Sequence, residues 1–143
     1  GVAEAGFDGA HLVRAVVVDD LRALNAAARA DGVHLAVQSG YRSEAYQARV
    51  HEGWRAALGA ERAALVSARP GHSEHQLGST ADLSTTRERR RAVRNTDPVH
   101  TWLVENAPRF GWRQTYLADN TEQTGYIEEP WHWRYMGIPK TDG

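Results

Sequence analysis

The chain has 143 residues, 41% hydrophobic and 24% charged, which is enough for a core and typical of one globular domain. Its formal net charge of -1 gives no support to a nucleic-acid partner or an acidic membrane surface. The absence of cysteine excludes disulfides, thiolate metal sites and cysteine nucleophiles, and no apolar run approaches the roughly 18 residues of a membrane span.

The first part of the chain predicts a helix followed by a buried strand. Residues 1–10 are rich in glycine and alanine, and we expect them to form a loose lead-in to a single domain that spans 1–143. From residue 19 or 20 to residue 30, apolar side chains recur at helical spacing and an Asp-Gly pair ends the pattern. Residues 33–39 carry apolar side chains at alternate positions, which predicts a buried strand.

The middle of the chain predicts two helices, a loop and a short strand. Ser43 can cap a helix over 44–58, and a shorter helix follows over 60–67. An Arg-Pro-Gly sequence at 69–71 ends that helix and opens a loop. Residues 80–83 are expected to form the short strand.

The last part of the chain predicts a helix and two strands. The charged run 85–94 indicates a solvated loop or helix face. An Asp-Pro pair at 97–98 starts a helix that ends near Gly111. Residues 112–116 and 126–128 are expected to be strands on either side of a polar loop. This order of elements predicts an α+β domain with a small antiparallel sheet, flanked by helices on one side.

His75 and Asp82 are the first candidate site residues. They lie seven positions apart, so in one continuous strand they would point to opposite faces. They can converge only if the chain turns at Gly78. Alone, such a pair is more often a structural hydrogen-bonded pair than a metal site.

His132 and Glu129 strengthen the case for a metal. His132 stands between two tryptophans, where the alternative is a core histidine with a satisfied ring. Glu129 is costly to bury in such a segment without a charge partner, and a metal-bound water is such a partner. Two imidazoles, one carboxylate and a water form a catalytic zinc set; calcium would need more oxygens, and non-haem iron would imply an oxygenase.

Several further residues are weighed against a structural role. Arg42, at a strand end, suits a carbonyl oxygen that becomes negative, but a surface ion pair is the alternative. Ser73 has an alternative as a loop cap. We exclude His72 as a ligand because a fourth protein ligand would close the site. Most of a set of four aromatic residues are expected to pack in the core rather than line a cleft: Tyr116, Tyr126, Trp131 and Trp133.

Three motifs together resemble the VanY-type D-alanyl-D-alanine carboxypeptidases, which are zinc peptidases that trim bacterial peptidoglycan stem peptides. They are Ser73-x-His75-x-x-Gly78 with Asp82, Ser39-Gly40-Tyr41-Arg42-Ser43, and Glu129-Pro130-Trp131-His132. The resemblance runs from about Val33 to Gly137. The wider fold group includes hedgehog domains and lysostaphin-like peptidases. Thr80 stands where the family usually has alanine, which leaves substrate detail open.

The resemblance implies a role for each motif residue. It implies three ligands for one zinc ion per chain: His75, Asp82 and His132. It implies Glu129 as the catalytic base and Arg42 as the group that binds the scissile carbonyl. Two residues would hold the C-terminal portion of the substrate: Gln38 and Ser73.

The resemblance also implies hydrolysis of the C-terminal D-alanine of peptidoglycan stem peptides. The alternatives are an L,D-carboxypeptidase on tetrapeptide stems, a peptidoglycan endopeptidase, and a non-catalytic metal-stabilised binding module, against which Glu129 argues. We expect a monomer that acts outside the cytoplasm, in the cell envelope or after secretion. Because the chain begins at Gly1 without methionine, we expect it to be a trimmed fragment in which no targeting segment is present.

Overall fold

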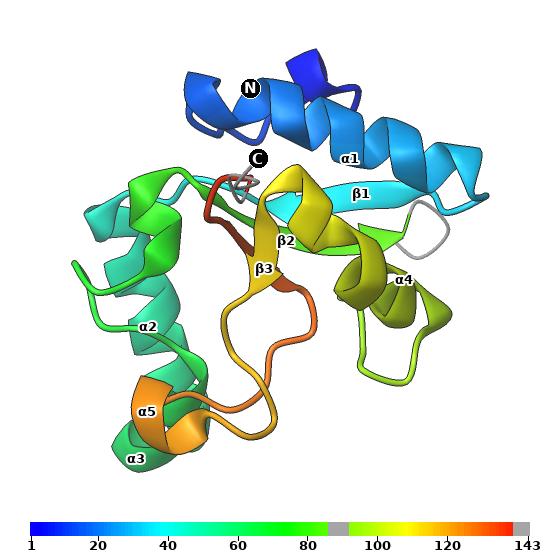
Figure 1. Ribbon diagram of the computed structural model, residues 1–143. Helices are drawn as coiled ribbons and strands as arrows, with labels where there is room; N and C mark the ends of the chain where they lie inside the picture. Colours follow the sequence, from blue (N-terminus) through cyan, green and yellow to red (C-terminus); the bar gives the residue numbers. More distant parts are fainter. Residues whose placement is uncertain (86–91, 139–143) are drawn as a thin grey trace.

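The computed structural model describes residues 1–85 and 92–138 (Figure 1). Within them, four strands form one antiparallel sheet in the order β1-β2-β4-β3. The strands are β1 (Leu35–Ser39), β2 (Thr80–Thr85), β3 (Trp112–Gln114) and β4 (His132–Tyr135). The α+β prediction and the antiparallel sheet are therefore confirmed.

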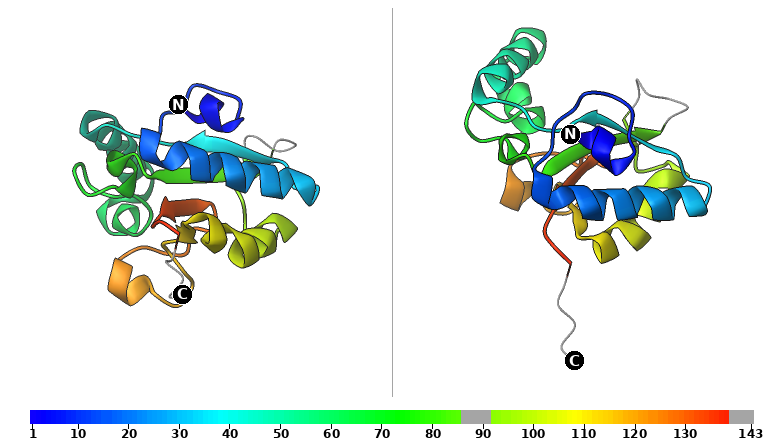
Figure 2. Two further views of the ribbon diagram at one scale, coloured as in Figure 1. Left: turned by 45° about the horizontal axis from the view of Figure 1, so that its top comes forward. Right: turned by 90° about the horizontal axis from the view of Figure 1, so that it is seen from above.

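The described helices are α1 (Val18–Ala30), α2 (Glu44–Leu58), α3 (Ala60–Val66), α4 (Pro98–Asn106) and α5 (Thr121–Thr124). Short 3-10 turns accompany them: η1 (Val2–Ala5), η2 (Ala15–Val17), η3 (Glu74–Leu77) and η5 (Ala107–Phe110). Helices α2 and α3 lie together near one end of the sheet, with α4 toward the other (Figures 1 and 2). No helix in the described ranges is both long and apolar enough to cross a membrane.

One hydrophobic core joins α1 and α4 to the sheet. Helix α1 buries one apolar stripe completely, including Leu21 and Leu24, as its helical spacing predicts. The sheet contributes Leu83 and Trp133 to the same cluster. Because these large side chains leave water together, their burial is the main source of stability for the fold.

The amino-terminal residues differ from the expectation of a loose lead-in. Val2, Ala5 and Phe7 are buried in the core cluster, with exposed fractions of 4% or less. Their backbone is tied down as well, since the Val2 amide donates to the His11 carbonyl at 2.9 Å. The apolar residues among the glycines therefore make this segment part of the domain.

The last predicted strand is misplaced in the sequence. Residues 126–128 form no strand, because Ile127 donates its amide to Leu65 and Glu129 donates its amide to Tyr116. The strand is β4, three residues beyond Glu129, and the expected polar loop contains α5. Of the charged run 85–94, residues 86–91 lie outside the described part of the chain.

Candidate metal centre

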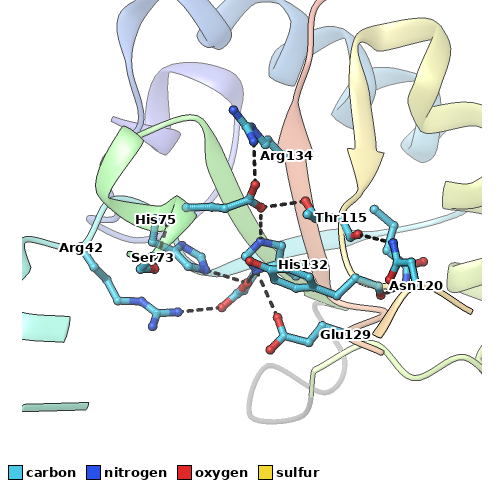
Figure 3. Close-up of polar contacts among 12 residues, drawn as sticks. Arg42, Ser73, His75, Thr115, Asn120, Glu129, His132 and Arg134 are labelled. Atoms are coloured by element: carbon cyan, nitrogen blue, oxygen red, sulfur yellow. Dashed lines mark hydrogen bonds and ion pairs between the residues drawn. The ribbon is translucent and has the colours of Figure 1, made fainter. Parts of the chain in front are cut away.

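Three side chains bring ligand atoms close together: His75, Asp82 and His132. Figure 3 shows the two histidines, with Arg42 and Glu129 beside them. His75 Nε2 lies 3.0 Å from Asp82 Oδ1, and His132 Nδ1 lies 3.4 Å from the same oxygen. All the ligand atoms of this cluster fall within 4.8 Å of one another. The three residues are at most 8% exposed, so they form a buried group that could hold a metal ion.

The strand ladder positions two of these residues. Asp82 on β2 pairs directly with His132 on β4. Because side chains alternate along a strand, Asp82, His132 and Gln38 project from the face of the sheet opposite the core. The core residues that flank them on the same strands are Val37, Leu83 and Trp133. The sheet therefore separates an apolar face from a polar one.

A short turn of helix brings in the third residue. The Ser73 hydroxyl caps η3 by accepting a hydrogen bond from the His75 amide at 3.2 Å. Gly78 ends η3 in the left-handed conformation, with φ of 73°. This conformation favours glycine, so the chain reverses here and β2 begins two residues later. The predicted turn at Gly78 is confirmed.

Each histidine uses its second ring nitrogen to contact the protein. His75 Nδ1 lies 2.7 Å from the Gly40 carbonyl, and His132 Nε2 lies 2.8 Å from Glu74 Oε1. Both partners can only accept, so these nitrogens carry the protons. In the neutral rings, His75 Nε2 and His132 Nδ1 therefore keep the lone pairs that a metal requires.

Asp82 is oriented in the same way. Its Oδ2 accepts a hydrogen bond from Arg42 Nη2 at 3.1 Å, which leaves Oδ1 toward the histidines. A tetrahedral zinc ion about 2.0–2.1 Å from its ligands separates ligand atoms by roughly 3.3 Å. The observed separations of 3.0 and 3.4 Å are close to that value, so this donor set fits zinc.

The charges around the cluster are strongly coupled. Burial alone would raise the pKa of Asp82, but contacts with His75 and His132 hold it well below its usual range. Burial opposes protonation of His132, yet hydrogen bonds to Asp82 and Glu74 raise its pKa to about 9. Burial raises the pKa of Glu129 to about 7. The raised pKa of His132 reports the negative charge of Asp82, Glu74 and Glu129, and this charge favours a bound cation.

Glu129 lies beside the cluster. Its Oε2 is 3.3 Å from His132 Nδ1, and its amide donates to the Tyr116 carbonyl at 3.0 Å. The Tyr116 ring in turn lies over the His132 ring, with centroids 4.7 Å apart. A carboxylate is thus held next to the ligand atoms.

The cluster opens into a cavity of about 400 Å³. Its wall contains Gln38 and Ser73, and Tyr46 and Trp54 of α2 also line it. Three of the four weighed aromatic residues also line it: Tyr116, Tyr126 and Trp131. The fourth, Trp133, packs in the core at 1% exposed, and Tyr116 is 9% exposed although it also lines the cavity.

Arg42 is not a surface residue. Its side chain is 18% exposed, and its guanidinium donates to Ser39 Oγ, Gln47 Oε1 and Asp82 Oδ2 at 3.0–3.1 Å. The surface ion-pair alternative is therefore wrong. His72, by contrast, is exposed and contacts the Pro70 carbonyl at 3.1 Å, outside the cluster.

Glu74 is the site residue that sequence reasoning missed. It lies one position before His75 and contacts His132, which is 58 positions away. Its place in the histidine motif was the signal that could have drawn attention to it. Thr80 is fully buried, and its hydroxyl has no hydrogen-bond partner among the described residues.

The comparisons with known proteins agree with this geometry. Residues 10–138 match the family model described as VanY: D-alanyl-D-alanine carboxypeptidase. A D-alanyl-D-alanine carboxypeptidase of Enterococcus faecalis is 40% identical over 122 residues, covering 78% of this chain and 44% of that protein. The four curated relatives are matched over 34 to 55% of their own length, so the chain spans about half of them or less.

Solved structures share the fold as well. A vancomycin-resistance D,D-pentapeptidase VanY variant in complex with Zn(II) is 35% identical, with a TM-score of 0.80 over 95% of this chain and 82% of that one. The L,D-carboxypeptidase LdcB is 31% identical, with a TM-score of 0.80 over 92% of this chain and 64% of that one.

Proposed function

The chain belongs to the VanY family of D-alanyl-D-alanine carboxypeptidases, and from this we propose that it is a zinc metallopeptidase that hydrolyses the C-terminal D-alanine of peptidoglycan stem peptides. The observation that carries the proposal is the convergence of three buried ligand residues with a spare carboxylate at the end of one cavity. His75 Nε2, Asp82 Oδ1 and His132 Nδ1 would hold one zinc ion. Zinc bound there supplies a Lewis acid, which polarises a carbonyl group and acidifies water.

Glu129 is the general base and acid in this proposal. Its carboxylate is the acidic side chain next to the ligand atoms that the ligand set does not use. It accepts a proton from the attacking water and returns it to the departing amine of D-alanine. Proton transfer by a positioned side chain contributes typically about 10²–10⁴-fold to the rate.

Arg42 binds the oxygen of the scissile carbonyl. Ser39 and Gln47 hold its guanidinium in the wall of the cavity, so a fixed positive charge faces the reacting group. A donor prepared for a developing oxyanion is typically worth about 2.7–4 kcal/mol. Gln38 and Ser73, which line the same cavity, hold the C-terminal portion of the substrate.

The remainder of the stem peptide extends toward α2. There Tyr46, Val50 and Trp54, spaced four residues apart on one helix face, line the cavity. A substrate of this kind is found in the bacterial cell wall. We therefore propose that the protein acts as a monomer outside the cytoplasmic membrane, in the cell envelope or as a secreted enzyme.

The second candidate is an L,D-carboxypeptidase that acts on tetrapeptide stems. It is favoured by the match to LdcB, which covers nearly as much of the chain as the match to the D,D-pentapeptidase. The two activities share the metal and the base. They differ in the residue that precedes the scissile bond.

Mass spectrometry of synthetic stems separates these functions. Pentapeptide, tetrapeptide and cross-linked stems are incubated with zinc-loaded protein, with and without a chelator. We expect one alanine to be lost from the pentapeptide alone, and the chelator to stop the reaction. Loss from the tetrapeptide alone identifies an L,D-carboxypeptidase, and cleavage of the cross-linked stem alone identifies an endopeptidase. No cleavage of any stem contradicts the enzymatic proposal and leaves the binding module.

A further inference from the structure

The two histidines of the candidate centre are supported by chemically different groups. His75 donates to the neutral carbonyl of Gly40, whereas His132 donates to the carboxylate of Glu74. We propose that Glu74 is a positioning residue that fixes the ring of His132 and strengthens it as a zinc ligand. This inference rests on the zinc site of the proposed function.

Glu74 is held in place by side chains from three other parts of the chain. Its Oε1 accepts hydrogen bonds from His132 Nε2 at 2.8 Å and from the Thr115 hydroxyl at 2.7 Å. Its Oε2 accepts from Arg134 Nη1 at 2.8 Å. The side chain is only 12% exposed, and each of its contacts stabilises the charged form. The carboxylate is therefore a fixed acceptor rather than a mobile surface group.

The contact with His132 settles which ring nitrogen faces the metal. With the proton on Nε2 directed at Glu74, the lone pair of Nδ1 points toward Asp82 Oδ1. A carboxylate partner also makes the imidazole a stronger donor than a carbonyl partner does. Loss of such a partner typically lowers metal affinity about 10–100-fold.

The position of Glu74 also links two ligands. Residues 74 and 75 are consecutive in η3, so this one turn presents His75 itself and the carboxylate that orients His132. Any displacement of η3 would disturb both histidines together. The Ser73 cap and the turn at Gly78 therefore act on the whole site, and not on His75 alone.

A purely structural role is the competing explanation, because the ion pair with Arg134 could by itself tie η3 to β4. The geometry distinguishes the two roles. Arg134 uses Oε2, while the oxygen that faces His132 is Oε1 and is shared with Thr115. The histidine contact and the arginine contact can therefore be removed separately.

The test measures zinc affinity by competition with a chromophoric chelator, using the full chain with Glu74→Ala, Glu74→Gln or Arg134→Gln. We expect a loss of about 10–100-fold for Glu74→Ala, a smaller loss for the isosteric Glu74→Gln, and less than a threefold change for Arg134→Gln. Glu52→Gln is the matched control, because Glu52 is an exposed glutamate that pairs with Arg55 and is not part of the ligand cluster.

A second readout reports on the His132 ring itself. In zinc-loaded protein labelled with ¹⁵N, we expect a slowly exchanging Nε2 proton of His132 that broadens or disappears in Glu74→Ala and survives in Arg134→Gln. Thermal unfolding of each variant is also measured after zinc has been removed with a chelator, so that a variant that does not fold is recognised. If Glu74→Ala fails to fold, the zinc affinity of Glu74→Gln is compared with that of wild type instead.

Two results would overturn the inference. One is zinc affinity within twofold of wild type in the folded Glu74 variants. The other is wild-type protein that binds no zinc. Failure of the proposed function looks different, because a chain that cleaves no stem can still lose zinc affinity when Glu74 is replaced.

Discussion

Glu129 is the residue on which the proposed chemistry depends most directly. Its carboxylate lies 3.3 Å from His132 Nδ1 but is not part of the ligand set. We predict that Glu129→Gln, which keeps the shape and removes the base, lowers kcat about 10²–10⁴-fold while zinc content stays at one per chain. Steady-state kinetics on a stem peptide measure kcat, and metal analysis of the same sample measures the zinc content.

His75→Ala is the partner experiment, since it removes a ligand and should remove the zinc with the activity. The two variants separate binding from chemistry. A Glu129→Gln enzyme with near-normal turnover would mean that another group takes the proton.

Thr80 offers a test of packing beside the site, because it lies on the same face of β2 as Asp82. Its hydroxyl is buried without a partner among residues 1–85 and 92–138, and such a group costs about 1–3 kcal/mol. Thr80→Val keeps the branched shape and removes the hydroxyl. We predict that the free energy of unfolding in urea rises by about 1 kcal/mol.

Thr115→Val provides the contrast, because the Thr115 hydroxyl donates to Glu74 at 2.7 Å. That variant should lose stability by a similar amount. Equal destabilisation of both variants would show that the Thr80 hydroxyl is satisfied after all.

For individual residues, the sequence predicted which side chains converge at the site. It could not predict which neighbouring groups hold those side chains in place. His75, Asp82, His132 and Glu129 stand out because their residue types have few other uses in apolar segments. Glu74 does not stand out, because a glutamate beside a loop looks like a solvated residue. Its role appears only when β4 brings His132 to within 2.8 Å.

Among the elements, the helices were predicted more accurately than the strands. Helix α2 has the predicted bounds, because Ser43 caps its start and Gly59 follows its end. Strand β4 was missed, although its polar and apolar residues alternate, because a pattern of four residues is too short to decide. The Tyr-Ile pair at 126–127 favoured a strand by propensity, but no neighbouring strand pairs with it.

Gly40 follows the last residue of β1, and its carbonyl contacts the His75 ring. Substitution of Gly40 therefore tests whether the end of β1 supports the metal centre. A Cβ there would lie 2.4 Å from the Leu12 carbonyl oxygen, which already accepts from the Tyr41 amide. Because the obstacle is backbone, the chain must shift. We predict that Gly40→Ala lowers the free energy of unfolding by about 1–3 kcal/mol and weakens zinc binding, because the Gly40 carbonyl supports His75.

Gly53→Ala is the matched control. Gly53 lies inside α2 with nothing within 4 Å of the position of a Cβ, so alanine only restricts the unfolded chain. This variant should be more stable by about 0.8–1.0 kcal/mol, with zinc affinity unchanged. Chemical denaturation measures the stability of both variants, and chelator competition measures their zinc affinity. A Gly40→Ala variant with unchanged stability and zinc affinity would contradict the close approach of Leu12.

For the whole molecule, the site depends on long-range packing rather than on any one element. The ligands come from η3, β2 and β4, and the register of β2 with β4 brings two of them together. The core on the opposite face of the sheet fixes that register, because a slip by one residue would exchange the two faces. Organisation as a single domain over 1–143 stays a prediction, which the shared core supports.

Because the ligands lie on separate elements, zinc should stabilise the fold as well as the reaction. A ligand that binds only the native state adds about 2.7 kcal/mol at a free concentration 100 times its Kd. For a chain of this size we predict that Tm rises by roughly 6–11 °C when zinc is added back to chelator-treated protein. Scanning calorimetry at fixed pH and protein concentration measures the change. His75→Ala should show no such rise, since it lacks a ligand, and Glu129→Gln should show nearly all of it. An equal response in wild type and His75→Ala would mean that zinc stabilises the protein from a different site.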